Sequence, residues 1–151
     1  SMQPLHARPP VRMWHKKVPE KNWDTAFAWK QLRENGAVLV YGSDWPIVSC
    51  DVREGARHAI TRKPWSPGGR EQKLDLSQAL DAYTRSAALA EYAAKRKGTI
   101  QPGMLADIVI LSGKFSGLAA ENPPRIDIRA TICDGRVVYD SEKDEESGRP
   151  V

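Results

Sequence analysis

The chain has 151 residues, of which 40% are hydrophobic and 28% charged, and it carries a formal net charge of +4. This composition is typical of a globular domain with a real hydrophobic core. The basic residues are scattered among acidic ones, and no apolar run approaches the ~20 residues that span a bilayer. We therefore expect neither a nucleic-acid partner nor a membrane partner.

The two cysteines, Cys50 and Cys133, lie far apart and form neither a disulfide framework nor a zinc-binding motif. The expectation is reduced thiols in a cytoplasmic protein. The first residues, Ser1-Met2-Gln3-Pro4, predict no signal peptide. They fit either a vector-derived serine before an initiator methionine or the middle of a longer protein.

Residues 1–21 are rich in proline and basic side chains and show no periodicity, so they predict a loop. This loop carries His6 and His15. For a histidine in such a segment, an exposed or loop-bracing position is the ordinary expectation.

Residues 23–35 carry an apolar stripe that predicts a helix, with Asn22 or Asp24 as its N-cap. Gly36 stands where a left-handed C-terminal cap is needed. Residues 37–41 are all apolar, which is typical of a strand buried on both faces. A helix, a glycine turn and a buried strand together predict an αβ unit of a parallel sheet.

Asp44 lies directly after this expected strand, between Gly42 and Pro46. In barrels of parallel strands, catalytic groups lie at this end of the sheet. The local pattern leaves two interpretations open. Asp44 is either a functional carboxylate at a strand tip or a residue that caps the next helix or braces a loop.

After this turn, Asp51 predicts the cap of a helix that runs to about Thr61 and contains His58 as a surface or packing histidine. Residues 63–70 hold two prolines and two glycines and predict a loop. The glycines lack the spacing of a phosphate-binding motif.

Residues 76–83 predict a short helix capped by Asp75 or Ser77, and residues 86–95 predict a second, alanine-rich helix. Gly98 follows the second helix as a C-terminal signal.

A strand is expected over residues 106–111, after a turn-rich connector. Asp134-Gly135, flanked by residues 129–133 and 136–139, is the strongest two-residue signal for a β-hairpin. The chain thus changes character near residue 98. We expect one domain over residues 1–97, β-strands and a hairpin over 98–140, and an acidic, flexible tail over 141–151.

Four segments occur in an order that resembles the C-terminal portion of a metal-dependent amidohydrolase. The nearest branch is that of the N-substituted formamide deformylase-like enzymes. The four segments are Gly42-Ser43-Asp44-Trp45-Pro46, residues 79–84, residues 98–111 and residues 132–139. In addition, residues 2–6 resemble the seventh barrel strand of that branch.

The resemblance implies an α/β fold: a C-terminal fragment of a (β/α)8 barrel, with strands 7 and 8 and their helices, followed by strands of a small β-sandwich domain. Residues 37–42 would form barrel strand 8, with Asp44 at its tip. Strands after Gly103 would belong to the sandwich, where Asp107 would be structural.

The resemblance also implies a divalent metal, usually zinc, and hydrolysis of a small-molecule amide or formamide at a non-peptide carbon–nitrogen bond. Asp44 would serve as metal ligand and catalytic residue, orienting a water molecule and passing its proton to the leaving amine. His6, at the mouth of the barrel, would contact the substrate.

The other metal ligands of the family include a His-x-His pair and two single histidines, whereas this chain has only three histidines and no such pair. A catalytic zinc normally takes three protein ligands. We therefore expect a fragment that is inactive alone and that self-associates or binds an N-terminal partner chain. The alternative is a non-catalytic interaction module, with Asp44 a remnant cap and the basic loop from Arg8 to Lys17 as its binding surface.

Overall fold

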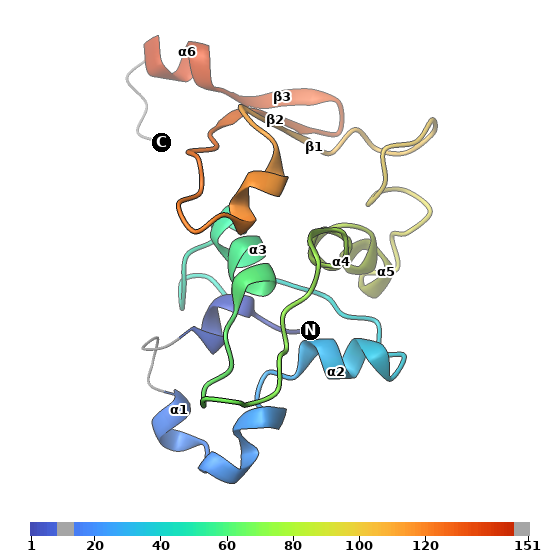
Figure 1. Ribbon diagram of the computed structural model, residues 1–151. Coiled ribbons are helices and arrows are strands. Elements are labelled where there is room, and N and C mark those ends of the chain that lie inside the picture. The colour runs from blue at the N-terminus through green and yellow to red at the C-terminus, as the bar shows by residue number, and fades with distance from the viewer. Residues whose placement is uncertain (9–13, 147–151) are drawn as a thin grey trace. The chain divides into compact units, whose positions relative to one another are not determined.

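The computed structural model describes residues 1–8 and 14–146. The chain separates into two compact units, Ser1–Ala87 and Ala88–Val151. The first is built from short helices and loops and the second contains the sheet (Figure 1). No helix among the described residues is long and apolar enough to cross a membrane. The domain limits expected at residues 97 and 140 stay predictions.

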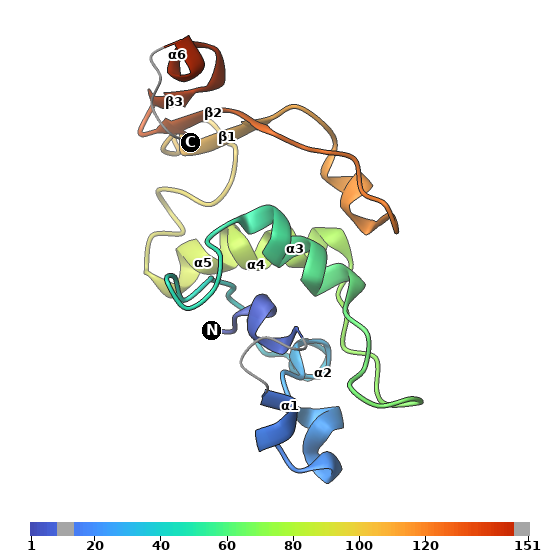
Figure 2. The same cartoon turned by 90° about the vertical axis from the view of Figure 1, so that its left-hand side faces the viewer.

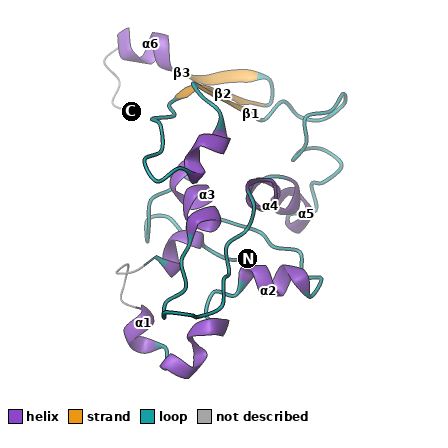
Figure 3. Cartoon of the chain, viewed as in Figure 1, coloured by secondary structure: helices purple, strands orange, loops and turns teal. Residues whose placement is uncertain are grey.

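The first unit contains helical elements joined by loops (Figure 3). Its last helix, α5, extends past Ala87 into the second unit. These elements are η1 (Pro4–Ala7), α1 (Trp14–Lys17), η3 (Glu20–Thr25), α2 (Trp29–Glu34), α3 (Val52–Thr61), α4 (Leu76–Tyr83) and α5 (Arg85–Ala90). The prediction of an unbroken loop over residues 1–21 was therefore wrong. Pro4 occupies the first position of η1, where its fixed φ favours a helical turn.

The helix predicted over residues 23–35 is divided in two. Phe27 adopts a positive φ of 51°, and α2 begins only at Trp29. Its N-cap is Ala28, so the expectation that Asn22 or Asp24 caps this helix was wrong. A positive φ is costly for a bulky residue, and the contact of Phe27 with Trp65 together with the burial of Trp29 outweighs the local helical preference.

Gly36 ends α2 as predicted, with a φ of +86°. The Gly36 N–H donates to the Arg33 carbonyl at 2.9 Å, and the Ala37 N–H donates to the Leu32 carbonyl at 3.0 Å. This pair of bonds is a Schellman motif, which satisfies carbonyls that the helix end leaves free.

The strand predicted over residues 37–41 is reduced to one parallel bridge between Met2 and Tyr41. The Met2 N–H donates to Val40 at 2.8 Å, and Gly42 donates to Met2 at 3.2 Å. Burial on both faces was also wrong, because Val38 is 60% exposed. The described residues offer this segment one bridging residue and no parallel ladder, so a strand covered on both faces does not form.

The helices predicted after Asp51 and Asp75 are confirmed. Asp51 accepts the N–H of Arg53 at 2.8 Å at the start of α3. At the start of α4, Asp75 and Gln78 form a reciprocal capping box. Helix α3 packs against both α4 and η1 (Figure 2).

Helix α5 ends at Ala90, before the predicted limit at residue 95. Tyr92 adopts a φ of 60°, and Ala93 donates to the Ala88 carbonyl at 2.8 Å. Helix α5 therefore ends in a Schellman motif, as α2 does, but Tyr92 instead of a glycine adopts the left-handed conformation.

The core of the first unit surrounds Trp29, which is fully buried. The Arg62 guanidinium lies 4.7 Å from the centroid of the Trp29 ring, and 5.7 Å from that of Trp65. It donates hydrogen bonds to the carbonyls of Phe27 at 2.6 Å and Ala26 at 3.0 Å. The buried cation is therefore held by aromatic faces and main-chain acceptors.

The second unit holds a three-stranded antiparallel sheet in the order β1-β2-β3. The strands are β1 (Ile108–Leu111), β2 (Ile128–Cys133) and β3 (Arg136–Asp140). The predicted hairpin is confirmed: Asp134 and Gly135 both have positive φ, 48° and 75°, as a type I′ turn requires. Asp107 accepts the N–H of Asp134 at 2.8 Å, a structural contact with the hairpin turn.

The helices of this unit outside the sheet are η4 (Phe115–Ala119) and α6 (Ser141–Glu146). The second lies where a flexible tail is expected, and residues 147–151 fall outside the described part of the chain. The architecture is thus mixed helix and sheet, with a small antiparallel sheet.

Candidate active site

Asp44 lies in a turn at the end of the segment that bridges to Met2. The Ile47 N–H donates to the Asp44 carbonyl at 2.8 Å, the Trp45 N–H donates to the Ser43 hydroxyl at 3.2 Å, and Asp44 has a φ of +58°. Aspartate tolerates this left-handed conformation better than most residues. Its side chain is 57% exposed. The interpretation of Asp44 as a helix cap was wrong, since Asp51 caps α3.

His6 lies on η1 and faces Asp44. Its Nε2 atom is 3.8 Å from Asp44 Oδ2, and its side chain is 11% exposed. That distance is within the range of an ion pair but longer than a hydrogen bond. His6 Nε2 is also buried without a hydrogen-bond partner. The structure therefore brings the two residues singled out from the sequence together, and their chemical roles stay predictions.

The Met2–Tyr41 bridge explains this proximity. It aligns the first residues in parallel with residues 40–42, and the turn of η1 then carries His6 toward the loop that holds Asp44. Tyr41, at the other end of the bridge, is anchored by an edge-on contact of its ring with Trp29, with ring centroids 5.9 Å apart. The site is thus supported by the core of the first unit.

The metal-binding capacity of the chain is limited by the number of donors. No group of three or more His, Cys, Asp or Glu side chains with the geometry to hold a metal occurs among the described residues. The His6–Asp44 pair offers two donor side chains, whereas a catalytic zinc takes three from the protein. The residues present therefore do not fit a complete catalytic metal site by themselves.

A cavity of about 180 Å³ lies beside the turn. Sequence reasoning did not identify it, although residues 42–46 and 79–84 were singled out and contribute three of its lining residues. Its lining consists of Leu5, Gly42, Ser43, Ser49, Cys50, Asp51, Val52 and Tyr83.

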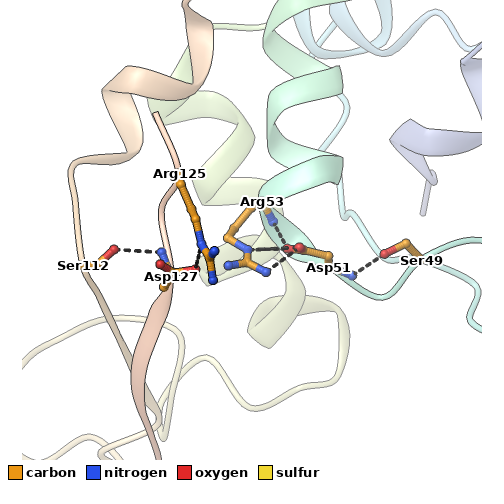
Figure 4. Close-up of polar contacts among 6 residues, drawn as sticks. All are labelled: Ser49, Asp51, Arg53, Ser112, Arg125 and Asp127. Carbon is orange, nitrogen blue, oxygen red and sulfur yellow. Dashed lines mark hydrogen bonds and ion pairs between the residues drawn. The ribbon is translucent and has the colours of Figure 1, made fainter. Parts of the chain in front are cut away.

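Asp51, one of the lining residues, is tightly bound to Arg53 (Figure 4). The Arg53 Nη2 atom lies 2.7 Å from Asp51 Oδ2, and Nε donates to both carboxylate oxygens at 2.9 and 3.0 Å. The hydrogen bonds from Arg53 lower the pKa of Asp51 below its ordinary value. The Ser49 hydroxyl accepts the Asp51 N–H at 3.1 Å. This carboxylate is therefore committed to the start of α3.

The second unit has a similar cluster (Figure 4). There, Ser112 accepts the N–H of Asp127 at 2.8 Å, and Arg125 Nε donates to the Asp127 carboxylate at 2.8 Å. These exposed contacts brace a loop before β2.

His58 packs in the core, as one interpretation of the sequence expects. Its ring lies edge-on to Trp29 with centroids 6.4 Å apart. Burial, reinforced by the positive charges of Arg62, Arg8 and Arg57, lowers its pKa to about 4. The side chain of His15 lies outside the described part of the structure.

Comparison with known proteins identifies the family. The family model described as "Amidohydrolase family" matches residues 1–139. The chain belongs to the amidohydrolase family. A curated relative, Protein LONG AFTER FAR-RED 3 from Arabidopsis thaliana, is 33% identical over 119 residues, which cover 74% of this chain and 20% of that protein.

Solved structures agree with this family assignment. A metal-dependent hydrolase from Pyrococcus furiosus has a TM-score of 0.55 and 25% identity, over 68% of this chain and 20% of that one. An amidohydrolase from Thermotoga maritima has a TM-score of 0.59 and 21% identity, over 87% of this chain and 30% of that one. This member of the amidohydrolase family therefore spans between 20% and 30% of the length of these relatives.

Proposed function

We propose that this chain supplies the C-terminal part of a metal-dependent hydrolase of non-peptide carbon–nitrogen bonds, of the formamide deformylase-like branch. The observation that carries the proposal is the approach of His6 Nε2 to Asp44 Oδ2, at 3.8 Å, in a chain of the amidohydrolase family. Its substrate is a small molecule with an amide or formamide group.

Asp44 acts as the general base. Its carboxylate is 57% exposed and is carried on a hydrogen-bonded turn, so a water molecule can reach it. The carboxylate takes a proton from water as the water oxygen bonds to the scissile carbonyl carbon. It then gives that proton to the amine nitrogen as the carbon–nitrogen bond breaks.

His6 contributes to substrate binding. Its ring is held nearly buried by η1, while Nε2 has no hydrogen-bond partner in the protein. An unpartnered buried nitrogen is costly, and a polar group of a bound substrate would satisfy it.

A divalent metal, in our proposal zinc, binds in the complete enzyme with Asp44 as one ligand. The support comes from the relative from Pyrococcus furiosus, whose structure is named a metal-dependent hydrolase. The His6–Asp44 pair leaves the ligand set incomplete. We therefore assign the remaining ligands to an N-terminal partner chain in the complete enzyme.

The barrel arrangement belongs to the same proposal. In the complete enzyme, residues 37–42 act as the last barrel strand, and an N-terminal partner chain or a second copy pairs with them and covers their exposed side. The parallel direction of the Met2–Tyr41 bridge and the 60% exposure of Val38 support this assignment.

The test is hydrolysis of a panel of N-substituted formamides and amides, measured by amine release. We expect no turnover by the 151-residue chain alone. We expect turnover by the form purified from source cells through a C-terminal tag, which retains any longer chain or partner. Absence of both turnover and bound metal in that form would instead support a non-catalytic interaction module.

A further inference from the structure

The cavity of about 180 Å³ is lined in part by the residues that precede His6 and Asp44 in the sequence. Leu5 and Ser43, which line it, directly precede His6 and Asp44. Its volume is comparable with the ~150 Å³ of an apolar cavity that binds benzene. The space therefore suits a group of about the size of a six-membered ring.

Most of the surface of the cavity wall is apolar, and the charge of its one carboxylate, Asp51, is balanced by Arg53. Leu5, Val52 and the ring of Tyr83 supply apolar surface. Burial raises the pKa of Tyr83 to about 12, so its hydroxyl is uncharged at neutral pH. Asp51 is paired with Arg53, and no lysine or arginine is among the described lining residues. A charged ligand group would lose its hydration here without gaining a free counter-charge.

The position of Tyr83 is fixed by close packing on two sides. Its hydroxyl lies against Gly55 of α3 so closely that a Cβ atom at that position would overlap it. Its ring contacts that of Tyr41 edge-on, with centroids 5.4 Å apart. The wall is therefore formed before any ligand binds, which lowers the entropic cost of binding.

We propose that this cavity is the subsite for one uncharged, ring-sized apolar substituent of the substrate, with Val52 and Tyr83 setting its size limit. The assignment rests on the proposed hydrolase function of Asp44. It adds the substrate class: amides whose substituent beside the scissile bond is neutral and fills the cavity.

The two free cysteines allow a direct test of occupancy. Cys50 lines the cavity and Cys133 lies on β2 in the other unit, and both are exposed. Alkylation of the 151-residue chain by iodoacetamide is followed at each cysteine by mass spectrometry. Benzyl alcohol is the probe, because it carries the ring but no carbon–nitrogen bond.

We expect the probe to slow alkylation of Cys50 about fivefold at about four times its dissociation constant, since protection follows 1 + [L]/Kd. Alkylation of Cys133 should not change. Benzoate, which has the same ring and a negative charge, should protect Cys50 much less. Equal protection by benzoate, or no saturable protection by benzyl alcohol, would overturn the subsite.

A substitution that fills the cavity provides a second test of the subsite. Val52→Phe, at a position that is 44% exposed, should abolish the protection, whereas Val109→Phe, at a 53% exposed position of β1, should retain it. Protection that persists in Val52→Phe would also overturn the subsite.

The probe separates this inference from the proposed function because it is not a substrate. Protection of Cys50 in a protein whose native form never hydrolyses amides would contradict the proposed function alone. Hydrolysis by the native form, with Cys50 unprotected in the chain, would contradict the subsite alone.

Discussion

The Nε2 atom of His6 lies 3.8 Å from Oδ2 of Asp44, and the parallel bridge between Met2 and Tyr41 brings these two side chains together. His6 is nearly buried, whereas Asp44 is more than half exposed. His6 is therefore held in place by the protein core, whereas water can reach the carboxylate of Asp44. This asymmetry underlies the different roles that we propose for them.

Replacement of His6 tests its role in substrate binding. His6→Ala removes an interaction that we expect in both the bound substrate and the transition state. In the native, active form, KM should rise by about tenfold while kcat changes little. Steady-state kinetics on an N-substituted formamide measure both values. A large loss of kcat at unchanged KM would show that His6 acts in the chemical step instead.

Gly55→Ala tests the contact that positions Tyr83. Alanine is favoured over glycine in a helix by about 1 kcal/mol, but the added Cβ would overlap the Tyr83 hydroxyl. We expect a net loss of up to about 2 kcal/mol in the free energy of unfolding, because overpacking costs about 1–3 kcal/mol and the helical preference of alanine offsets about 1 kcal/mol of it. Urea denaturation measures this change.

Two further variants control this experiment. Tyr83→Phe removes the overlapping oxygen, so it should recover part of the loss when combined with Gly55→Ala. Gly113→Ala places a Cβ 3.6 Å from Ile126 at ordinary contact distance, and its effect should be small. Additive effects of Gly55→Ala and Tyr83→Phe would contradict the contact.

His58 predicts a pH dependence of stability. Its pKa is about 4 in the folded chain and near 6.5 when the chain is unfolded. Between these values the unfolded chain binds more protons, so the free energy of unfolding decreases as pH falls from 6.5 toward 4. The decrease should total on the order of 3 kcal/mol, since each unit of pKa difference corresponds to about 1.4 kcal/mol.

His58→Phe keeps a ring against Trp29 and removes the titration. Urea denaturation at pH 7 and pH 4.5 should therefore show a smaller acid-induced loss in His58→Phe than in the wild-type chain. Carboxylates such as Asp51 contribute to acid sensitivity in both proteins, so the difference isolates the histidine. Identical losses in the two proteins would show that His58 is solvated when protonated.

The hairpin turn of the second unit makes a separate prediction. Gly135 has a φ of 75°, a conformation that costs a residue with a Cβ about 1–2 kcal/mol. Gly135→Ala should accelerate amide hydrogen exchange in β2 and β3, whereas Asp134→Asn should leave it nearly unchanged, because asparagine suits a type I′ turn. Equal exchange in wild type and Gly135→Ala would exclude strain at this turn.

The sequence correctly predicted those helix ends and turns that are determined by one or two neighbouring residues. The capping residues Asp51 and Asp75 begin their helices, Gly36 ends α2, and Asp134-Gly135 forms the turn of the hairpin. In each case one side chain or one φ preference decides the structure. Long-range context is not needed for these positions.

The predictions from the sequence were wrong where contacts between distant segments of the chain decide the structure. The apolar run at residues 37–41 has the composition of a doubly buried strand, but a strand forms only where a neighbouring strand pairs with it along its length. In the described residues its one bridging residue is Met2. Phe27 divides a predicted helix because its aromatic contact with Trp65, at 5.7 Å between ring centroids, joins residues distant in sequence.

The candidate site was predictable as a pair of residues but not as a cavity. Asp44 stood out by its place after an apolar run and His6 by its resemblance to a family segment, and the structure places them together. The place of Tyr83 in the cavity wall was not predicted, because it depends on the close approach of α4 to Gly55 on α3. The pattern of apolar residues in neither helix predicts that approach.

The most direct test of the central claim is the metal content and amide hydrolysis of the native form, purified through a C-terminal tag, with and without Asp44→Asn. The account predicts bound zinc and turnover in the wild-type protein, and a fall in turnover of at least about 10²-fold in Asp44→Asn, the range of a lost general base. Asp75→Asn, an equivalent change at a helix cap, should keep both. Undiminished turnover in Asp44→Asn would contradict the account.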